Sequence, residues 1–187
     1  MSQKLQGINI AILVTNGFEQ VEMTKPRQAF NDAGASTYII SPAGERVRGW
    51  NHYDKADYFQ VDLPLDKANA NNYDALLLPG GTVNPDQLRT NKTAVKFIKA
   101  FFEADKPVAA ICHGPWTLIE ADVVKGHKIT SWSSLKTDLT NAGATWVDEE
   151  VVVDGNLITS RNPDDLPWII NAATSLFSRQ KAILQSV

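Results

Sequence analysis

The sequence contains a single cysteine, Cys112, and the residues around it are typical of a catalytic nucleophile. The small and apolar run Val108–Ile111 ends at this cysteine, and His113 and Gly114 follow it directly. The order small-x-nucleophile-x-Gly between a buried strand and a helix predicts a nucleophile elbow. An elbow presents the side chain above the carboxyl edge of a sheet and at a helix N-terminus, which lowers the pKa of a thiol. The alternative is a structural cysteine buried at a strand end.

A base and an oxyanion site could be built from residues near this cysteine. His113 has a near-neutral side chain and could act as a base or proton shuttle; the alternative is a solvent-facing residue at a helix start. Gly80 and Gly81 follow a buried strand, so no side chain shields their amides. Together with the elbow amides at His113 and Gly114, they could bind an oxyanion or a carbonyl. The alternative for the glycine pair is a tight turn that needs backbone freedom.

Glu19 comes just after the first predicted strand, where its carboxyl could overhang the thiol. A carboxylate there would repel a thiolate, so the two groups would share one proton. A protonated Glu19 would donate a hydrogen bond to the sulfur and shuttle protons. The alternative is an ordinary glutamate in the first turn of a helix. We interpret His52 and His127 as surface residues, and one cysteine with three separated histidines argues against a metal site.

Composition limits the class of protein. The chain has 187 residues, of which 43% are hydrophobic and 21% charged, and this suits one compact domain with a sizeable core. A single cysteine cannot form an internal disulfide, which favours a reducing compartment. We find no apolar signal segment or membrane-spanning stretch, and a net charge of −3 gives no electrostatic case for nucleic acid. We therefore expect a cytoplasmic protein without membrane or nucleic-acid partners.

Alternating strand and helix patterns predict an α/β fold. Strands are expected at residues 8–15, 37–40, 47–50, 58–62, 74–81, 108–112, 128–131, 145–147, 151–153 and 157–160. Helices are expected at 18–33, within 85–105 after a loop, and at 115–124, 135–141 and 166–184. Pro26 should kink or divide the first of these helices. The alternation predicts a mostly parallel sheet with helices on both faces, in one domain over residues 1–187, with sites beyond the carboxyl ends of its strands.

Five motifs lie in order along the chain: Phe18-Glu-Gln-Val-Glu22, Leu78-Pro-Gly-Gly81, Ala110-Ile-Cys-His-Gly-Pro115, Asn141-Ala-Gly143, and Glu150-Val-Val-Val-Asp154 with Thr159-Ser-Arg161. Together they closely resemble the DJ-1/PfpI superfamily, and within it the PfpI-type intracellular proteases and bacterial general stress proteins. The resemblance runs from about Ile8 to Ile170. It implies a flavodoxin-like three-layer sandwich of the class I glutamine amidotransferase-like kind.

The same resemblance implies roles for individual residues. It places the nucleophile at Cys112, its histidine at His113 and an acidic partner at Glu19. In the PfpI-type proteases a third acidic residue, from a neighbouring subunit, follows the Gly-Gly turn, and Asp86 is our candidate for it. The resemblance implies no cofactor and an assembly of at least two copies, a homodimer or a hexamer. Aromatic residues that could mark a subunit contact, with core packing as the alternative, are Trp50, Tyr53, Tyr58 and Phe59.

Three functions for this site stay open at this point. In the first, a Cys112 thiolate adds to a small reactive aldehyde, as in the glutathione-independent glyoxalases and deglycases reported for the family, within a stress response. In the second, Cys112, His113 and Asp86 hydrolyse peptides across a subunit contact. In the third, the protein is no enzyme but a redox sensor or chaperone whose Cys112 is oxidised to a sulfinate. We expect the aldehyde enzyme.

Overall fold

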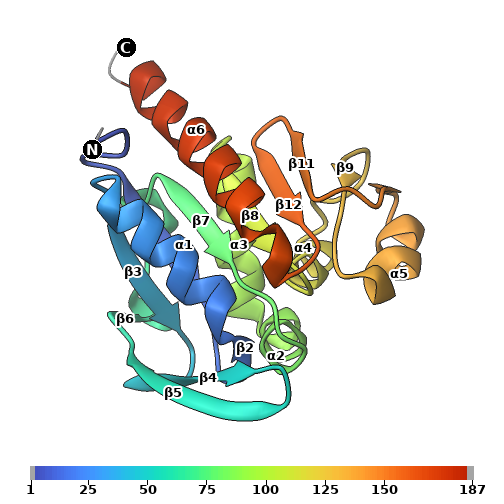
Figure 1. The fold of residues 1–187 in the computed structure, drawn as a ribbon, viewed down its shortest axis with the longest axis horizontal. Helices are drawn as coiled ribbons and strands as arrows, with labels where there is room; N and C mark the ends of the chain where they lie inside the picture. The colour runs from blue at the N-terminus through green and yellow to red at the C-terminus, as the bar shows by residue number, and fades with distance from the viewer. Residues whose placement is uncertain (1–2, 185–187) are drawn as a thin grey trace.

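A mostly parallel sheet forms the middle layer of a three-layer α/β sandwich (Figure 1). The computed structural model describes residues 3–184. In this part of the chain the sheet has seven strands in the order β11-β12-β8-β7-β1-β3-β6, and only β11 and β12 pair antiparallel. Their bounds are β1 Asn9–Leu13, β3 Ser36–Ser41, β6 Leu63–Pro64, β7 Ala75–Leu78, β8 Val108–Ile111, β11 Val151–Asp154 and β12 Leu157–Ser160. The flavodoxin-like fold class expected from the sequence is confirmed.

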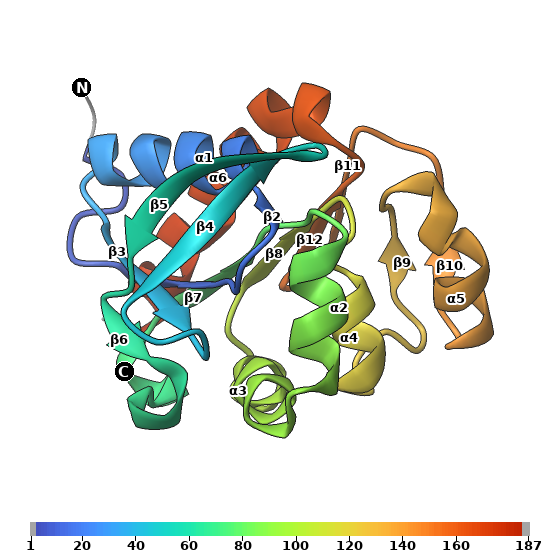
Figure 2. The same cartoon turned by 90° about the horizontal axis from the view of Figure 1, so that it is seen from below.

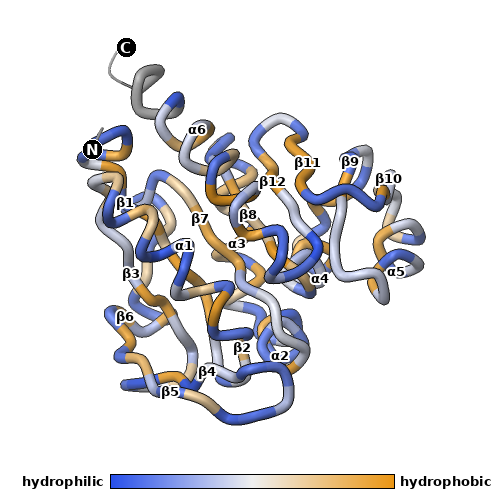
Figure 3. The backbone as a smooth tube through the Cα atoms, in the orientation of Figure 1, coloured by the Kyte–Doolittle hydropathy of each residue, from blue (hydrophilic) through white to orange (hydrophobic). Residues whose placement is uncertain are grey.

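The central strands are apolar along their whole length because helices cover both faces of the sheet. Every residue of β7 and β8 is buried, and Figure 3 shows hydrophobic residues along both strands. Continuous apolar runs of this kind form strands that are buried on both faces. Alternate side chains enter two separate cores: Leu76 and Leu78 pack with Phe97 on one face, whereas Leu77 packs with Phe30 on the other.

The helices form the two outer layers. Figure 2 shows α1 (Gln20–Asp32) and α6 (Leu166–Leu184) on one side of the sheet. On the opposite side lie α2 (Val83–Thr90), α3 (Lys92–Glu103) and α4 (Trp116–Glu120). At one end, α5 (Lys136–Asn141) packs beside the small parallel pair β9 (Lys128–Ile129) and β10 (Thr145–Trp146). Short 3-10 turns lie at Leu65–Lys67, Ala70–Asn72, Ser133–Leu135 and Pro163–Asp165. Among the described residues, no helix is long and apolar enough to cross a membrane.

A second small sheet joins the start of α1 to a projecting hairpin. It has the order β2-β4-β5, with β2 at Phe18–Glu19, β4 at Arg46–Asn51 and β5 at Asp54–Gln60. β2 pairs parallel with β4, and β4 pairs antiparallel with β5. The turn between β4 and β5 is therefore linked, through β2, to the first residues of α1.

The first helix and the segment after the Gly-Gly turn differ from the sequence-based expectation. α1 is one uninterrupted helix with Pro26 inside it. Of the two outcomes expected for Pro26, a kink or a division into two helices, the division was therefore wrong. A proline removes only one helical hydrogen bond, and burial of Met23, Pro26 and Phe30 against the sheet holds the helix in place. The start of the stretch 85–105, expected as a loop before a helix, lies in α2. The buried side chain of Asn84 fixes this helix, because it bonds to Thr15 N, Pro79 O and Gly80 O.

Candidate active site

The sheet topology brings three chain segments to one point. The chain leaves β1 for β3 on one side and later continues through β7 and β8 on the other, which makes the carboxyl ends of β1 and β7 a switch point. Glu19 follows β1, Gly81 follows β7 and Cys112 follows β8. A cavity of about 220 Å³ opens there. It is lined by Glu19, Glu22, His52, Tyr53, Gly81, Thr82, Cys112, His113, Trp132 and Pro163.

Cys112 occupies a nucleophile elbow. Its φ of 59° lies in the left-handed region, which is rare for a residue other than glycine. Such strain, of about 1–3 kcal/mol, persists only where the surroundings fix it. Here the Cys112 amide donates to Ser160 O at 3.0 Å, and its carbonyl accepts from Trp132 N at 2.9 Å. Gly114 closes the turn with a 2.7 Å bond from its amide to Ile111 O. A Cβ at Gly114 would collide with the carbonyl of Leu78, so the close packing of the turn on β7 requires glycine.

The imidazole of His113 lies beside the sulfur. Its Nδ1 is 3.2 Å from Cys112 Sγ, so these neighbours in sequence do meet in space. The ring stacks on Trp132 with centroids 5.8 Å apart, and Nε2 is 3.4 Å from Ser134 Oγ. Burial lowers the pKa of His113, which favours the neutral ring near pH 7. In the tautomer with its proton on Nε2, Nδ1 can accept the thiol proton.

Glu22 is the carboxyl beside the sulfur, and this corrects the expectation that Glu19 holds that place. Glu22 is 0% exposed; its Oε2 accepts from Gly80 N at 2.7 Å, and its carboxyl contacts the Cys112 thiol. Its Oε1 is buried without a hydrogen-bond partner among the described residues. Burial, reinforced by the charge of Glu19, raises the pKa of Glu22 to about 8. The group is therefore mostly protonated at neutral pH and able to donate to sulfur.

The protonation of Cys112 differs from what an elbow at a helix N-terminus predicts. Burial and the neighbouring Glu22 carboxyl raise the pKa of the thiol, and the amides of Gly81 and His113, which donate to the sulfur, only partly oppose them. The residue is 7% exposed, and α4 has only five residues and begins at Trp116. Desolvation of the anion therefore outweighs the attraction of the elbow amides. Sulfur in the resting protein is a thiol with a base beside it.

Glu19 also lines the cavity, but its carboxyl faces the hairpin rather than the sulfur. Glu19 Oε2 accepts from the backbone amide of His52 at 3.0 Å and lies 3.5 Å from His52 Nδ1. The His52 side chain is 76% exposed, in agreement with its interpretation as a surface residue, yet the residue also forms part of the cavity wall. The structure thus gives Glu19 a partner on the β4–β5 turn.

The three candidate oxyanion glycines do not have equivalent amides. The amide of Gly80 donates to Glu22, and the amide of Gly114 donates to Ile111 O, so both serve the protein's own structure. The amide of Gly81 donates toward Cys112 Sγ, as does the amide of His113. Among these amides, those of Gly81 and His113 are therefore the two that face the sulfur of Cys112.

Asp86 lies on the exposed side of α2 and is not among the residues that line the cavity. Its amide donates to Thr82 O. A role in orienting His113 would require Asp86 from a neighbouring subunit, and it stays a prediction. Over residues 3–184, no group of three or more His, Cys, Asp or Glu side chains is arranged to hold a metal ion.

The sequence held an unused signal for Glu22. Glu22, Pro26 and Phe30 recur at a spacing of four and are all buried in α1. A glutamate in the apolar stripe of a helix is expected to be buried, and buried glutamates nearly always have a partner. This spacing therefore favours Glu22 over Glu19 as the carboxyl inside the site. Trp132 and Pro163 were also missed as lining residues, because they come from segments distant in sequence that only the tertiary fold brings to the cavity.

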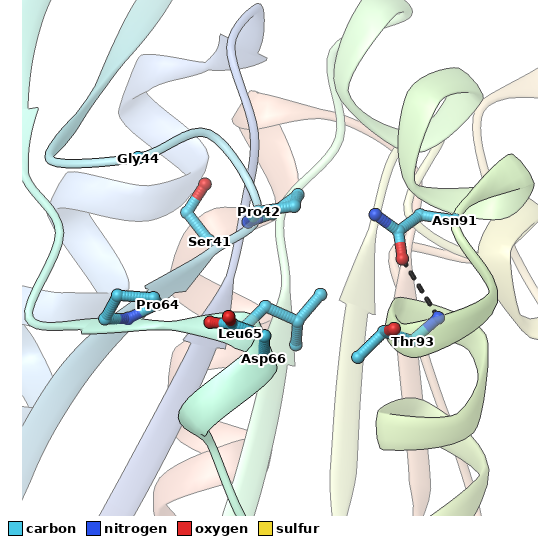
Figure 4. Close-up of a pocket in the computed structure, with 8 residues that line it drawn as sticks. All are labelled: Ser41, Pro42, Gly44, Pro64, Leu65, Asp66, Asn91 and Thr93. Atoms are coloured by element: carbon cyan, nitrogen blue, oxygen red, sulfur yellow. Dashed lines mark hydrogen bonds between the residues drawn. The ribbon is translucent and has the colours of Figure 1, made fainter.

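A larger cavity, of about 390 Å³, lies elsewhere at the carboxyl ends of β3 and β6 (Figure 4). Asn91, on its wall, accepts hydrogen bonds from Thr93 N and Ala94 N and thereby caps α3. The lining residues are Ser41, Pro42, Gly44, Pro64, Leu65, Asp66, Asn91 and Thr93, without a cysteine or histidine. The smaller cavity, which contains Cys112 and His113, is therefore the candidate active site.

The fold and the elbow together define the class: a flavodoxin-like α/β protein with a cysteine beside a histidine and a buried carboxyl at the switch point. The sequence model of the DJ-1/PfpI family matches residues 8–175, and the chain belongs to this family.

Three relatives match nearly the whole chain. "Putative cysteine protease YraA" of Bacillus subtilis (strain 168) is 48% identical over 158 residues, which are 84% of this chain and 90% of that protein. "General stress protein 18" of the same organism is 45% identical and covers 92% and 99%. "Deglycase PfpI" of Pyrococcus furiosus is 43% identical and covers 85% and 93%. Among solved structures, Schizosaccharomyces pombe DJ-1 shares the fold with a TM-score of 0.82 at 20% identity, covering 96% and 98%.

Proposed function

We propose that the protein is a cysteine-dependent enzyme of the stress response that converts small reactive aldehydes, in the manner of a glutathione-independent glyoxalase or deglycase. The observation that carries this proposal is that Cys112 Sγ lies 3.2 Å from His113 Nδ1 and also interacts with the carboxyl of Glu22. Burial lowers the pKa of His113 and raises that of Glu22, which favours a neutral ring and a protonated carboxyl. The cavity volume of about 220 Å³ is below the roughly 300–1,000 Å³ of pockets for drug-sized ligands, which favours a small substrate. The deglycase name of one relative agrees with this class.

The first step is addition of sulfur to the aldehyde carbon. His113 Nδ1 accepts the thiol proton as the S–C bond forms, so a stable thiolate is not needed beforehand. The carbonyl π-electrons move to oxygen, which the amides of Gly81 and His113 stabilise before it takes up a proton. With methylglyoxal the product is a hemithioacetal on Cys112.

The second step moves a proton between carbons. The proton on the hemithioacetal carbon is removed and the former ketone oxygen takes up a proton, which gives an enediol. The former ketone carbon is then protonated while the hydroxyl of the first carbon loses its proton, and the product is a thioester of lactate. Glu22 is suited to this shuttle because its pKa of about 8 lies close to neutral pH. Water then attacks the thioester, lactate leaves, and the thiol of Cys112 is regenerated, so no external oxidant or reductant is consumed.

The test is a steady-state assay of methylglyoxal consumption with lactate as the measured product. Cys112→Ala should abolish turnover, and Glu22→Gln should reduce it by at least a hundredfold, in the range of a lost general acid–base group. Trp168→Ala is a matched control, because Trp168 lies on α6 outside the cavity lining. Unchanged turnover in Cys112→Ala would refute the proposed function.

Peptide hydrolysis is the second candidate, favoured by the cysteine–histidine contact of 3.2 Å and by the protease name of one relative. It needs an acidic partner for His113 Nε2, which in this chain lies 3.4 Å from Ser134 Oγ. Asp86 of a neighbouring subunit is the predicted partner. An oligomer that cleaves peptides and loses this activity in Asp86→Asn would support the second candidate over the first.

A further inference from the structure

The turn between β4 and β5 forms one wall of the Cys112 cavity. Both turn residues, His52 and Tyr53, line it. His52 has a φ of 56°, so this turn also contains a non-glycine residue in the left-handed region. Tyr53 is 94% exposed although it lines the cavity, so it lies at the cavity mouth. A ring in that place can contact a group that extends from the reacting carbon.

Two contacts fix the hairpin to the start of α1. Gln20 bonds twice to Asp57, with its Nε2 donating to Oδ2 at 2.8 Å and its Oε1 accepting from Asp57 N at 2.9 Å. Nearer the turn, Glu19 Oε2 accepts from His52 N at 3.0 Å. Since the carboxyl of Glu19 is nearly buried, this bond is shielded from water and holds the strained turn. The same short segment that ends in Glu22 thus sets the position of the turn above the sulfur.

We propose that Tyr53 selects carbonyl substrates that carry a flat, unsaturated substituent, and that Glu19 is a positioning residue which holds Tyr53 over the cavity through the backbone amide of His52. The identity of these substrates rests on the proposed function. In such a substrate the aldehyde reaches Cys112 at the base of the cavity, while the substituent lies against the Tyr53 ring at its mouth. Aromatic rings attract each other in offset or edge-to-face geometry beyond simple burial of area.

The position of Glu19 predicts how its variants behave. The bond to His52 requires an acceptor oxygen but no charge, so Glu19→Gln should keep it and Glu19→Ala should lose it. A direct role in proton transfer would give the opposite pattern, with glutamine as defective as alanine. His52→Asn should also be tolerated, because the donor is the backbone amide and asparagine adopts the left-handed region readily.

The experiment compares phenylglyoxal with methylglyoxal. Tyr53→Ala and Glu19→Ala should lower the phenylglyoxal-to-methylglyoxal ratio of kcat/KM by roughly threefold to tenfold, mainly through a higher KM for phenylglyoxal. Tyr53→Phe and Glu19→Gln should keep the wild-type ratio. Tyr58→Ala is the control, because Tyr58 is an exposed aromatic of the same hairpin that stacks with Arg46 and Arg48 and does not line the cavity.

A second measurement does not depend on turnover. Cys112 displaces iodide from iodoacetamide or from its N-phenyl derivative, forming a thioether with loss of iodide, and the rates are followed by intact mass. The ratio of the alkylation rate with N-phenyl iodoacetamide to the rate with iodoacetamide should fall in Tyr53→Ala and Glu19→Ala. It should keep the wild-type value in Tyr53→Phe and Glu19→Gln.

Two outcomes would contradict the proposal. Equal ratios in wild type and Tyr53→Ala would overturn the selection by Tyr53, and a fall of the ratio in Glu19→Gln as large as in Glu19→Ala would overturn the positioning role of Glu19. A wild-type protein that consumes no aldehyde but shows the alkylation pattern would refute the proposed function while keeping the role of the turn.

Discussion

Glu22 and Cys112 form a buried pair of acids in contact, with Glu22 also bound through Oε2 to Gly80 N at 2.7 Å. Burial is the largest cause of the raised pKa of both groups; Glu22 raises the pKa of Cys112 further, whereas the hydrogen bond with the Cys112 thiol lowers the pKa of Glu22. The pair therefore retains at least one proton at neutral pH and titrates as a unit. Sulfur and carboxyl oxygen can exchange this proton during a reaction without contact with bulk solvent.

The first prediction concerns stability against pH. The pKa of Glu22 is about 8 in the folded protein, against 4.5 in the absence of burial, so the folded state binds the proton more tightly than the unfolded chain. The free energy of unfolding should therefore fall as the pH rises from 4.5 to 8, by on the order of 5 kcal/mol from this group. Glu22→Gln cannot ionise and should lose this part of the pH dependence. Urea unfolding at pH 5, 6.5 and 8 measures the difference.

Cys112→Ala provides the matched comparison for this experiment. Burial is the largest cause of the raised pKa of Glu22, and removal of the sulfur leaves the carboxyl enclosed. The alanine variant should therefore keep most of the wild-type loss of stability towards pH 8. Parallel stability curves for wild type and Glu22→Gln would mean that the carboxyl is hydrated or already ionised at low pH.

The second prediction concerns thiol reactivity. Because burial and Glu22 raise the pKa of Cys112, the rate of alkylation by iodoacetamide should still increase above pH 9, where an ordinary thiol with a pKa of about 8.5 is mostly ionised. Glu22→Gln removes the neighbouring charge, so its alkylation curve should move to lower pH. Cys112 is the single cysteine of the chain, and the mass increase therefore reports this residue alone. A wild-type midpoint below pH 7 would contradict the raised pKa.

The third prediction separates backbone strain from close packing. Gly81 and Gly126 have similar positive φ angles, of 75° and 84°. A Cβ at Gly126 meets no heavy atom within 4 Å, whereas a Cβ at Gly81 would overlap the carbonyl of Gly17 and approach Glu19 N. Gly126→Ala should cost about 1–2 kcal/mol from the left-handed backbone alone. Gly81→Ala should cost about 1–3 kcal/mol more through overpacking, and it should also change the alkylation rate of Cys112. Equal losses of stability would show that the backbone at Gly17 moves freely.

The elbow was predictable because its chemistry is local in sequence. A buried strand, a nucleophile and the glycine of the turn follow one another within seven residues around Cys112, and the parallel sheet follows from apolar runs separated by helices. Proximity to the end of β1 did not predict whether Glu19 or Glu22 lies beside the sulfur of Cys112. Pairing of β2 with β4 turns Glu19 towards the hairpin, whereas the first turn of α1 carries Glu22 inward. This depends on contacts between segments about 30 residues apart, such as Glu19 and His52, which no local pattern encodes.

The last prediction concerns His113. Burial lowers its pKa below the ordinary 6.5, so the NMR titration of its ring should have a midpoint below 6.5, and the neutral base should persist into mildly acidic solution. Trp132 covers one face of the ring, so Trp132→Ala should admit water and raise the pKa towards 6.5. The acidic limb of the pH–rate profile should then move to higher pH in the same variant, because the imidazole must be neutral to accept the thiol proton. Trp168→Ala removes an exposed tryptophan outside the cavity and should leave the His113 titration in place. If the wild-type midpoint lies above 6.5, the ring is a charged partner of the sulfur and cannot be the base of the proposed first step.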